Sequence, residues 1–284
     1  MFKYLLTLSS IILFLYSCKE KDVEIPSYIF INDIDLQITD VNQGSSRSSI
    51  SDAYVFVNEK LVGIYDLPAT VPILTEGKVT IKVGGGIKQN GVYTSRLEYP
   101  FYTRYETEVD LVRGEFDTIH PILQYTSATK FSTFFEDFTN SITFENGKNT
   151  DDSLAFITDP TIILEGPCGG IKLEGDNKRR FEFYTPTISN IPRNNSSPVY
   201  MELDFKGNIF VNFGAYFNDK IENEISFVLP PKDEWTKIYI NLTDILGVHG
   251  SAKNYNFLFG YSKYTTSFTG TAEFYIDNVK IIHY

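Results

Sequence analysis

Residues 272–282 read AEFYIDNVKII and close a series of short segments that are rich in aromatic and β-branched residues. Similar segments occur at 199–205 (VYMELDF), 209–216 (IFVNFGAY) and 235–242 (WTKIYINL). Residues of these types favour the pleated, half-buried surface of a β-sheet. No window combines a sustained helical stripe of apolar residues with caps at both ends. The sequence therefore predicts an all-β fold.

The composition agrees with this prediction and excludes some classes of partner. The 284 residues include 23 Phe, 19 Tyr and one Trp, which make 15% of the chain. Acidic residues number 36 against 25 lysines and arginines, so the formal net charge is −11. Phosphates would be repelled by this charge, and we expect neither a nucleic-acid partner nor a basic patch for anionic lipid.

Residues 27–125 are expected to form a first β-sandwich of short strands. Glycines 84–86 should end one of these strands, because a strand could continue through them only with strain or a bulge. A polar linker is expected at residues 125–130. The expected strands are residues 28–38, 53–57, 61–65, 77–83, 92–99 and 102–112.

A second sandwich is expected to occupy residues 131–284. The segment that ends at Leu229 is followed by Pro230 and Pro231, which cannot continue a central strand. The expected strands are residues 170–173, 180–184, 199–205, 209–216, 224–229, 235–242, 257–261 and 272–282.

Two resemblances refine this picture. Residues 53–85, AYVFVNEKLVGIYDLPATVPILTEGKVTIKVGG, resemble the immunoglobulin- or transthyretin-like modules of bacterial surface proteins, including the PEGA type. Residues 131–284 resemble the galactose-binding-like jelly roll of carbohydrate-binding modules, through FEDF at 135–138, WTKIYINL and FYIDNVKI at 274–281. The resemblances imply two tandem sandwiches, an immunoglobulin-like spacer or contact platform followed by a jelly-roll binding domain.

The first eighteen residues have the layout of a secretory signal, in which Lys3 precedes an apolar run that is too short to span a bilayer. Ser17-Cys18 resembles the lipobox of bacterial lipoproteins, which implies removal of residues 1–17 and acylation of Cys18, with palmitate among the chains. Residues 18–26 would tether the protein to the lipid bilayer of the outer membrane. The alternatives are an ordinary signal peptide cut elsewhere, or a buried hydrophobic segment.

Three further motifs bear on the cellular location. The tether sequence KEKDVEIP resembles the export signal of Bacteroidota surface lipoproteins, which favours the cell surface over the periplasmic face, although a solvated spacer would look the same. Asp117-Thr118-Ile119 and Asp152-Ser153-Leu154 resemble the O-glycosylation acceptors of exported Bacteroidota proteins.

Cys168 has no partner once Cys18 is acylated, and we expect it to be a small buried apolar residue rather than a reactive thiol.

The jelly-roll resemblance implies a structural calcium where the first and last strands meet. Asp277 would be one ligand, with Glu136 or Asp137 from the opening strand and Glu145 as an alternate. The alternative is that Asp277-Asn278 forms a turn or bulge and that Glu136 faces water.

Sugar binding by a jelly roll usually requires exposed aromatic rings beside amide or charged side chains. The alternative is that such rings fill the space between the sheets. The candidate rings are Trp235, Tyr239, Tyr261 and Tyr216, with Tyr184 and Tyr264 in addition.

The sequence does not predict an enzyme. Related glycosidases carry Glu-x-Asp-x-x-Glu, but residues 202–207 read ELDFKG, so glycine replaces the third carboxylate. Nucleophile-elbow, HExxH and phosphate-loop motifs are also missing. We therefore expect a non-catalytic protein that binds glycan, or alternatively an accessory subunit of an outer-membrane protein complex for uptake, secretion or barrel assembly.

Overall fold

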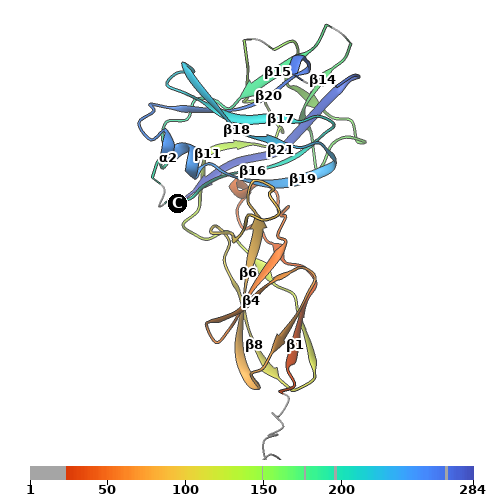
Figure 1. Ribbon diagram of the computed structural model, residues 1–284, viewed down its shortest axis with the longest axis vertical. Coiled ribbons are helices and arrows are strands. Elements are labelled where there is room, and N and C mark those ends of the chain that lie inside the picture. Colours follow the sequence, from red (N-terminus) through yellow and green to blue (C-terminus); the bar gives the residue numbers. More distant parts are fainter. Residues whose placement is uncertain (1–23, 149, 176, 195–196, 266–267) are drawn as a thin grey trace, which may run out of the picture.

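The computed structural model describes residues 24–148, 150–175, 177–194, 197–265 and 268–284. Within these ranges the chain is almost entirely β, with one short α-helix, α2 (Thr243–Val248), and the 3-10 turns η1 (Val41–Gln43) and η2 (Lys263–Thr265). Figure 1 shows two sandwiches, one built from the first part of the chain and one from the rest. The predicted fold class, two tandem β-sandwiches, is confirmed.

The first sandwich packs a five-stranded sheet against smaller sheets. In the larger sheet the order is β4 (Lys60–Asp66), β3 (Asp52–Val57), β6 (Gly77–Lys88) and β7 (Arg96–Glu98), with β8 (Tyr105–Leu111) also paired to β6. Alternate apolar residues of β3 and β6 point inward and are buried. The smaller sheets comprise β5 (Ala69–Ile73), β1 (Ser27–Ile31) and β9 (Phe116–Ile119), and the pair β10 (Ile122–Leu123) and β2 (Asp35–Leu36).

Strand β6 corrects the expectation that glycines 84–86 end a strand. It runs through all three of them and pairs with β3 as far as Gly86. A Cβ atom on Gly85 would lie 2.8 Å from Leu123 Cδ1, and one on Gly86 would lie 2.8 Å from Asp52 Cβ. The glycines therefore let neighbouring side chains approach the sheet closely, and the strand does not end there.

Two other expected strands are shorter than predicted. Residues 28–38 divide into β1 and β2 and do not form one strand. Only β7 remains of the strand expected at 92–99, because Gln89 N donates to Ser95 O (2.8 Å) and closes a loop over the intervening residues. In both segments the sequence of apolar residues continues, but a turn of the backbone interrupts the strand.

The second sandwich places a six-stranded sheet over a five-stranded sheet. The first runs β13 (Ala155–Ile157), β14 (Cys168–Leu173), β21 (Ala272–His283), β16 (Val199–Gly207) and β19 (Lys232–Asn241), and β11 (Lys130–Glu136) also pairs with β21. The second runs β12 (Glu145–Asn146), β15 (Arg180–Tyr184), β20 (Tyr255–Ser262), β17 (Val211–Phe217) and β18 (Glu222–Leu229). Many of the aromatic residues of this part of the chain fill the space between these sheets. The rings that are fully buried there include Phe138, Phe181, Phe183, Phe205, Phe213, Phe217, Phe257 and Phe259.

Cys168 in β14 is buried, as predicted. Its side chain is completely buried, and burial raises the pKa of the thiol to about 12. A thiol that stays protonated at neutral pH is a poor nucleophile. The residue therefore serves packing.

Gly214 in β17 offers a test of the packing between strands. A Cβ atom there would overlap the backbone carbonyl oxygen of Glu224 in β18, where the register shifts. We expect Gly214→Ala to lower the free energy of unfolding by about 1–3 kcal/mol, because the strand pair must separate to admit the methyl group. Urea denaturation measures this.

The matched control is Gly166→Ala, since a Cβ atom on Gly166 meets nothing within 4 Å. It should change the free energy of unfolding by less than about 0.5 kcal/mol. Equal effects of the two substitutions would contradict the strand contact.

Candidate functional site

The four rings predicted to bind sugar do not share a surface. Tyr261 is 5% exposed and packs on Phe181 within the core, so it is one of the rings that fill the space between the sheets. Trp235 is half-buried, and its Nε1 donates to Ile162 O (2.7 Å). Tyr239 is 1% exposed and belongs to the hydrophobic core of the first sandwich. Neither Tyr261 nor Tyr239 offers an exposed ring face, which corrects their assignment as sugar platforms.

Tyr216 and Tyr184 lie on the outer face of the five-stranded sheet, edge to face at 5.8 Å between ring centroids. The Tyr216 hydroxyl donates to Glu182 (3.0 Å), and Lys220 Nζ lies 4.3 Å from the centroid of the Tyr184 ring. Tyr264 is separate from them, at 67% exposure in η2. Tyr216 and Tyr184 are therefore the two of the six candidate rings that lie together on one face. Both already contact charged side chains, Glu182 and Lys220.

Two residues singled out for calcium have other roles. Glu136 is buried, and its carboxylate accepts hydrogen bonds from Phe138 N (2.9 Å) and Thr143 N (2.6 Å), so it organises a loop and does not face water. Asp277 Oδ1 accepts from Asn278 N (2.7 Å), and Asn278 has a φ of 51°, which matches the expected turn or bulge.

Of the remaining calcium candidates, Asp137 lies close enough to Asp277 to raise its pKa, and Glu145 lies on the other sheet. Asp137 Oδ1 accepts from Thr139 N (3.0 Å), while Glu145 pairs with Lys220 (2.8 Å) on the five-stranded sheet. Among the residues that the structure describes, no three His, Cys, Asp or Glu are grouped so that they could hold a metal ion. Structural calcium stays a prediction.

A buried cluster of charged and phenolic groups lies where the two sandwiches meet. Glu202, in the middle of β16, is completely buried. It accepts hydrogen bonds from the hydroxyls of Tyr99 (2.9 Å) and Tyr125 (2.8 Å), both in the first sandwich. Lys237 Nζ and Lys280 Nζ each lie 3.5 Å from Glu202 Oε2. We call these five residues the Glu202 cluster.

The pKa values of this cluster follow from burial and pairing. Burial alone would raise the pKa of Glu202, but Lys280 and Lys237 lower it below its usual value. Burial lowers the pKa of Lys280 to about 8 although Glu202 acts in the opposite direction. The carboxylate is therefore charged at neutral pH, and its charge is compensated inside the protein and not by water.

Further contacts fix the sandwiches against each other. Asn90 N donates to Tyr239 O (2.8 Å), and Asn241 N donates to Asn90 Oδ1 (2.8 Å), which joins the end of β6 to β19. Arg47 pairs with Asp204 (3.2 Å). Glu202 and Asp204 are the two carboxylates of the glycosidase-like pattern. Both form ion pairs inside the protein and are inaccessible to a substrate.

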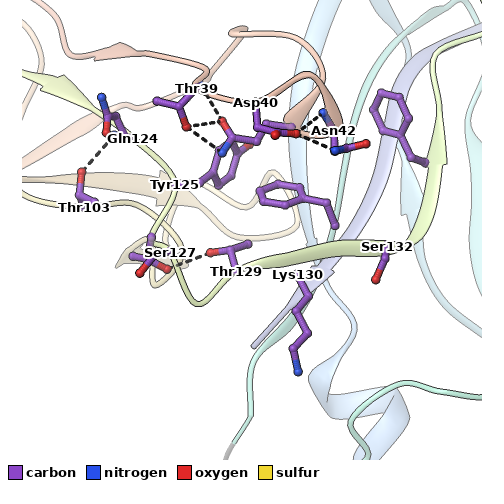
Figure 2. Close-up of a pocket in the computed structure, with 14 residues that line it drawn as sticks. Thr39, Asp40, Asn42, Thr103, Gln124, Tyr125, Ser127, Thr129, Lys130 and Ser132 are labelled. Carbon is purple, nitrogen blue, oxygen red and sulfur yellow. Dashed lines mark hydrogen bonds between the residues drawn. The ribbon is translucent and has the colours of Figure 1, made fainter.

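A cavity of about 900 Å³ opens beside the Glu202 cluster, and we call it the junction cavity. Figure 2 shows Thr39, Asp40 and Asn42 on one side of it and Thr129, Lys130 and Ser132 on the other. The first group comes from the turn around η1, and the second from the start of β11 and the residue before it. The other lining residues are Gln43, Thr103, Gln124, Tyr125, Thr126, Ser127, Phe131 and Phe135.

The polar groups of the junction cavity hold one another in place. Gln43 Oε1 accepts from Thr39 N (2.9 Å), and the Thr126 and Thr129 hydroxyls share a hydrogen bond of 2.9 Å. The Tyr125 and Phe131 rings stand at 87° to each other with centroids 4.9 Å apart. Fixed hydroxyls and amides beside aromatic rings can recognise a polar ligand that also has apolar faces.

Sequence reasoning missed this cavity because part of its wall is the segment interpreted as a linker. Tyr125 and Thr129 in that segment are buried. The sequence did contain one signal. In β16 and β19 the residues next to Tyr200 and Tyr239 face the core of the second sandwich, so these two large rings must face the opposite side of the sheet. Large apolar residues on both faces of a sheet indicate that both faces are covered.

Comparisons with known proteins find distant structural similarities to part of the chain. No family model and no curated protein matches the sequence. The family 11 carbohydrate-binding module of a cellulosomal cellulase from Clostridium thermocellum aligns over 55% of this chain and 95% of its own, with 14% identity and a TM-score of 0.35. A family 29 carbohydrate-binding module aligns over 55% of this chain and 91% of its own, with 12% identity and a TM-score of 0.33.

The enzymatically active domain of tailspike protein 4 from bacteriophage CBA120 is also similar, with 13% identity and a TM-score of 0.37. That alignment covers 51% of this chain but only 20% of the tailspike chain. Similarities of this size are confined to part of the chain, so a ligand must be inferred from the side chains of this protein itself.

Replacing Glu202 tests the buried cluster. Glu202→Gln keeps the shape and the hydrogen-bond acceptor but removes the negative charge between Lys237 and Lys280. We expect the free energy of unfolding to fall by about 3–5 kcal/mol, because buried ammonium groups lose their partner. Chemical denaturation measures this, with the exposed Glu108→Gln in β8 as control. A loss no larger than that of the control would show that Glu202 does not balance the lysines.

Asp277 makes stability depend on pH. Burial, together with Asp204, Glu165 and Asp137, raises its pKa from 3.8 to about 7. The folded state therefore binds more protons than the unfolded state between about pH 4 and 7, and stability falls as the pH rises through this window. The difference is at most about 4 kcal/mol.

We expect Asp277→Asn to remove this decline and to raise the melting temperature at pH 8 relative to wild type. Thermal denaturation at pH 5 and pH 8, with calcium and with a chelator, measures the effect. A calcium ligand would behave in the opposite way, because Asp277→Asn would then lower the melting temperature in calcium only.

Proposed function

We propose that the protein is a non-catalytic glycan-binding protein and that the junction cavity receives the sugar. The observation that carries the proposal is the chemistry of the cavity wall. Nine of its fourteen residues are neutral hydroxyl or amide residues, three are aromatic, and only Asp40 and Lys130 are charged. Sugars present hydroxyls around a ring with apolar faces, so they match both parts of this wall.

The size and stiffness of the cavity support the same proposal. About 900 Å³ accommodates a short oligosaccharide, within the usual range for ligand sites. The wall is held by internal hydrogen bonds and by the Glu202 cluster, so little ordering is required on binding. A preorganised polar wall favours a polar ligand over an apolar one, because its groups are already aligned.

The proposal includes an anchor at the outer membrane. Cys18 lies outside the described residues, so its lipidation stays a prediction. In Figure 1 strand β1 lies in the first sandwich, and the chain enters that sandwich at the end far from the junction. A lipid on Cys18 would then hold the junction cavity away from the membrane, at the cell surface in preference to the periplasmic face. No helix in the described ranges is long and apolar enough to cross a membrane.

The alternative proposal is an accessory subunit of an outer-membrane protein complex. Strand β4 lies at the edge of its sheet and exposes Leu61 (45%), Val62 (39%) and Ile64 (50%). Leu74 beside it is 62% exposed. An apolar edge strand is a surface to which a partner can add a strand. This observation favours a protein partner bound at the edge strand β4 of the first sandwich. In that case the junction cavity would have no role in binding.

Binding measurements separate the two proposals. A glycan array should identify neutral oligosaccharides that bind, and titration calorimetry should give their dissociation constants. We expect Asn42→Ala and Lys130→Ala to weaken binding about tenfold each, because a hydrogen bond to the sugar is worth about 1–1.5 kcal/mol. Both side chains are exposed, so the fold should be unaffected.

Glu108→Ala, exposed on β8 of the first sandwich, is the control and should bind as wild type does. Equal affinity of Asn42→Ala, Lys130→Ala and the control would rule out the junction cavity. Recovery of a stoichiometric membrane-protein partner, with no glycan bound, would favour the accessory subunit instead.

A further inference from the structure

A second, smaller cavity lies at the junction and differs in charge from the first. Its volume is about 310 Å³, and we call it the lysine pocket. It forms where the end of β6 and the loop after it meet β19, so both sandwiches contribute to it. Its wall is made by Ser49, Lys88, Asn90, Gly91, Tyr93, Phe205, Pro230, Lys232, Thr236, Lys237, Ile238 and Tyr239.

The wall of the lysine pocket has three lysines and no carboxylate, and the ammonium group of Lys237 is buried behind it. In a chain with a net charge of −11, such a concentration of positive charge is unexpected. Within the described residues, neither Lys88 nor Lys232 lies within ion-pair distance of an acidic group. The charge of Lys88 contributes to lowering the pKa of Asp66, but neither lysine is held in an ion pair, so both ammonium groups can pair with an anionic ligand.

Lys237 gives the pocket a buried cationic wall. Its side chain is 2% exposed, and its Nζ is buried without a hydrogen-bond partner in the described structure. Its ion-pair distances to Glu202 (3.5 Å) and Asp204 (3.7 Å) are longer than hydrogen bonds. The Lys237 ammonium group therefore faces Glu202 and Asp204 behind the wall, and direct pairing with an anion falls to Lys88 and Lys232.

The other wall residues favour a sugar over a simple ion. Tyr93 is 65% exposed, and both Lys88 Nζ (5.3 Å) and the Arg96 guanidinium carbon (4.3 Å) lie near the centroid of its ring. Asn90 and Thr236 add amide and hydroxyl groups. The volume matches one monosaccharide unit, and an aromatic ring with polar neighbours suits a pyranose.

We propose that the lysine pocket binds an anionic sugar residue, with Lys88 and Lys232 pairing with its carboxylate or sulfate group. This inference deepens the proposed glycan binding by naming the ligand class, but it uses a different cavity. The two proposals can therefore fail separately. Affinity at the lysine pocket should fall with increasing salt, because charge supplies most of the recognition.

The probes are trigalacturonate, its fully methyl-esterified form and a sulfated galactotriose, titrated into the purified protein. We expect wild type to bind trigalacturonate or the sulfated trisaccharide at least tenfold more tightly than the ester. Binding of the first identifies the ligand group as a carboxylate, and binding of the second identifies it as a sulfate. Equal affinity for charged and esterified sugars would overturn the proposal.

The double variant Lys88→Ala and Lys232→Ala should lose at least tenfold in affinity for the charged probe, and the matched pair Lys88→Arg and Lys232→Arg should retain it. The unchanged melting temperature of both variants shows that they fold. Asn42→Ala, in the junction cavity, should bind the charged probe as wild type does.

If the double alanine variant binds the charged probe unchanged, the lysine pocket is not the site. Loss of neutral-glycan binding in Asn42→Ala would still support the junction cavity. Conversely, wild type that binds trigalacturonate through the lysines but no neutral glycan supports the lysine pocket alone.

Discussion

A carboxylate without access to water must be compensated by the protein, and Glu202 is compensated from two directions. The lysines come from β19 and β21 of its own sheet, whereas the phenolic donors Tyr99 and Tyr125 come from the first sandwich. If the sandwiches separated, these donors would leave and the carboxylate would keep only part of its compensation. The cluster therefore couples the relative position of the two sandwiches to the energy of one buried charge. Backbone contacts between β6 and β19 act in the same direction.

Both cavities depend on this arrangement. Tyr125 donates to Glu202 and also lines the junction cavity, and Lys237 pairs with Glu202 and also lines the lysine pocket. Neither sandwich alone has a complete wall for either cavity. Binding sites formed between two units are usually adjustable, because interfaces within a chain tend to be polar and mobile. Here the buried ion pairs oppose such motion, so the cavities are preorganised.

Much of the fold could be predicted from the sequence, because aromatic and β-branched segments determine strands locally. Cys168 was correctly expected to be buried. The glycines of β6 were misjudged because their neighbours, Leu123 and Asp52, are brought there only by the fold. The Glu202 cluster joins residues 103 and 77 positions apart in the chain, and no local pattern shows such a contact. Tyr239 was a candidate for an exposed ring, but the first sandwich covers the outer side of its strand.

The charge distribution gives the lysine pocket a particular selectivity. At long range the protein is acidic and repels anions, but salt limits this repulsion to about 8–10 Å from the surface. An anionic ligand is then attracted only when it reaches the lysines themselves. A flexible polyanion without a suitable sugar ring gains little, since its other charges remain near an acidic surface. A sugar chain with isolated acidic residues places one charge on the lysines and neutral hydroxyls elsewhere. The protein should therefore discriminate by where the charge lies along a glycan, and not by how much charge the glycan carries.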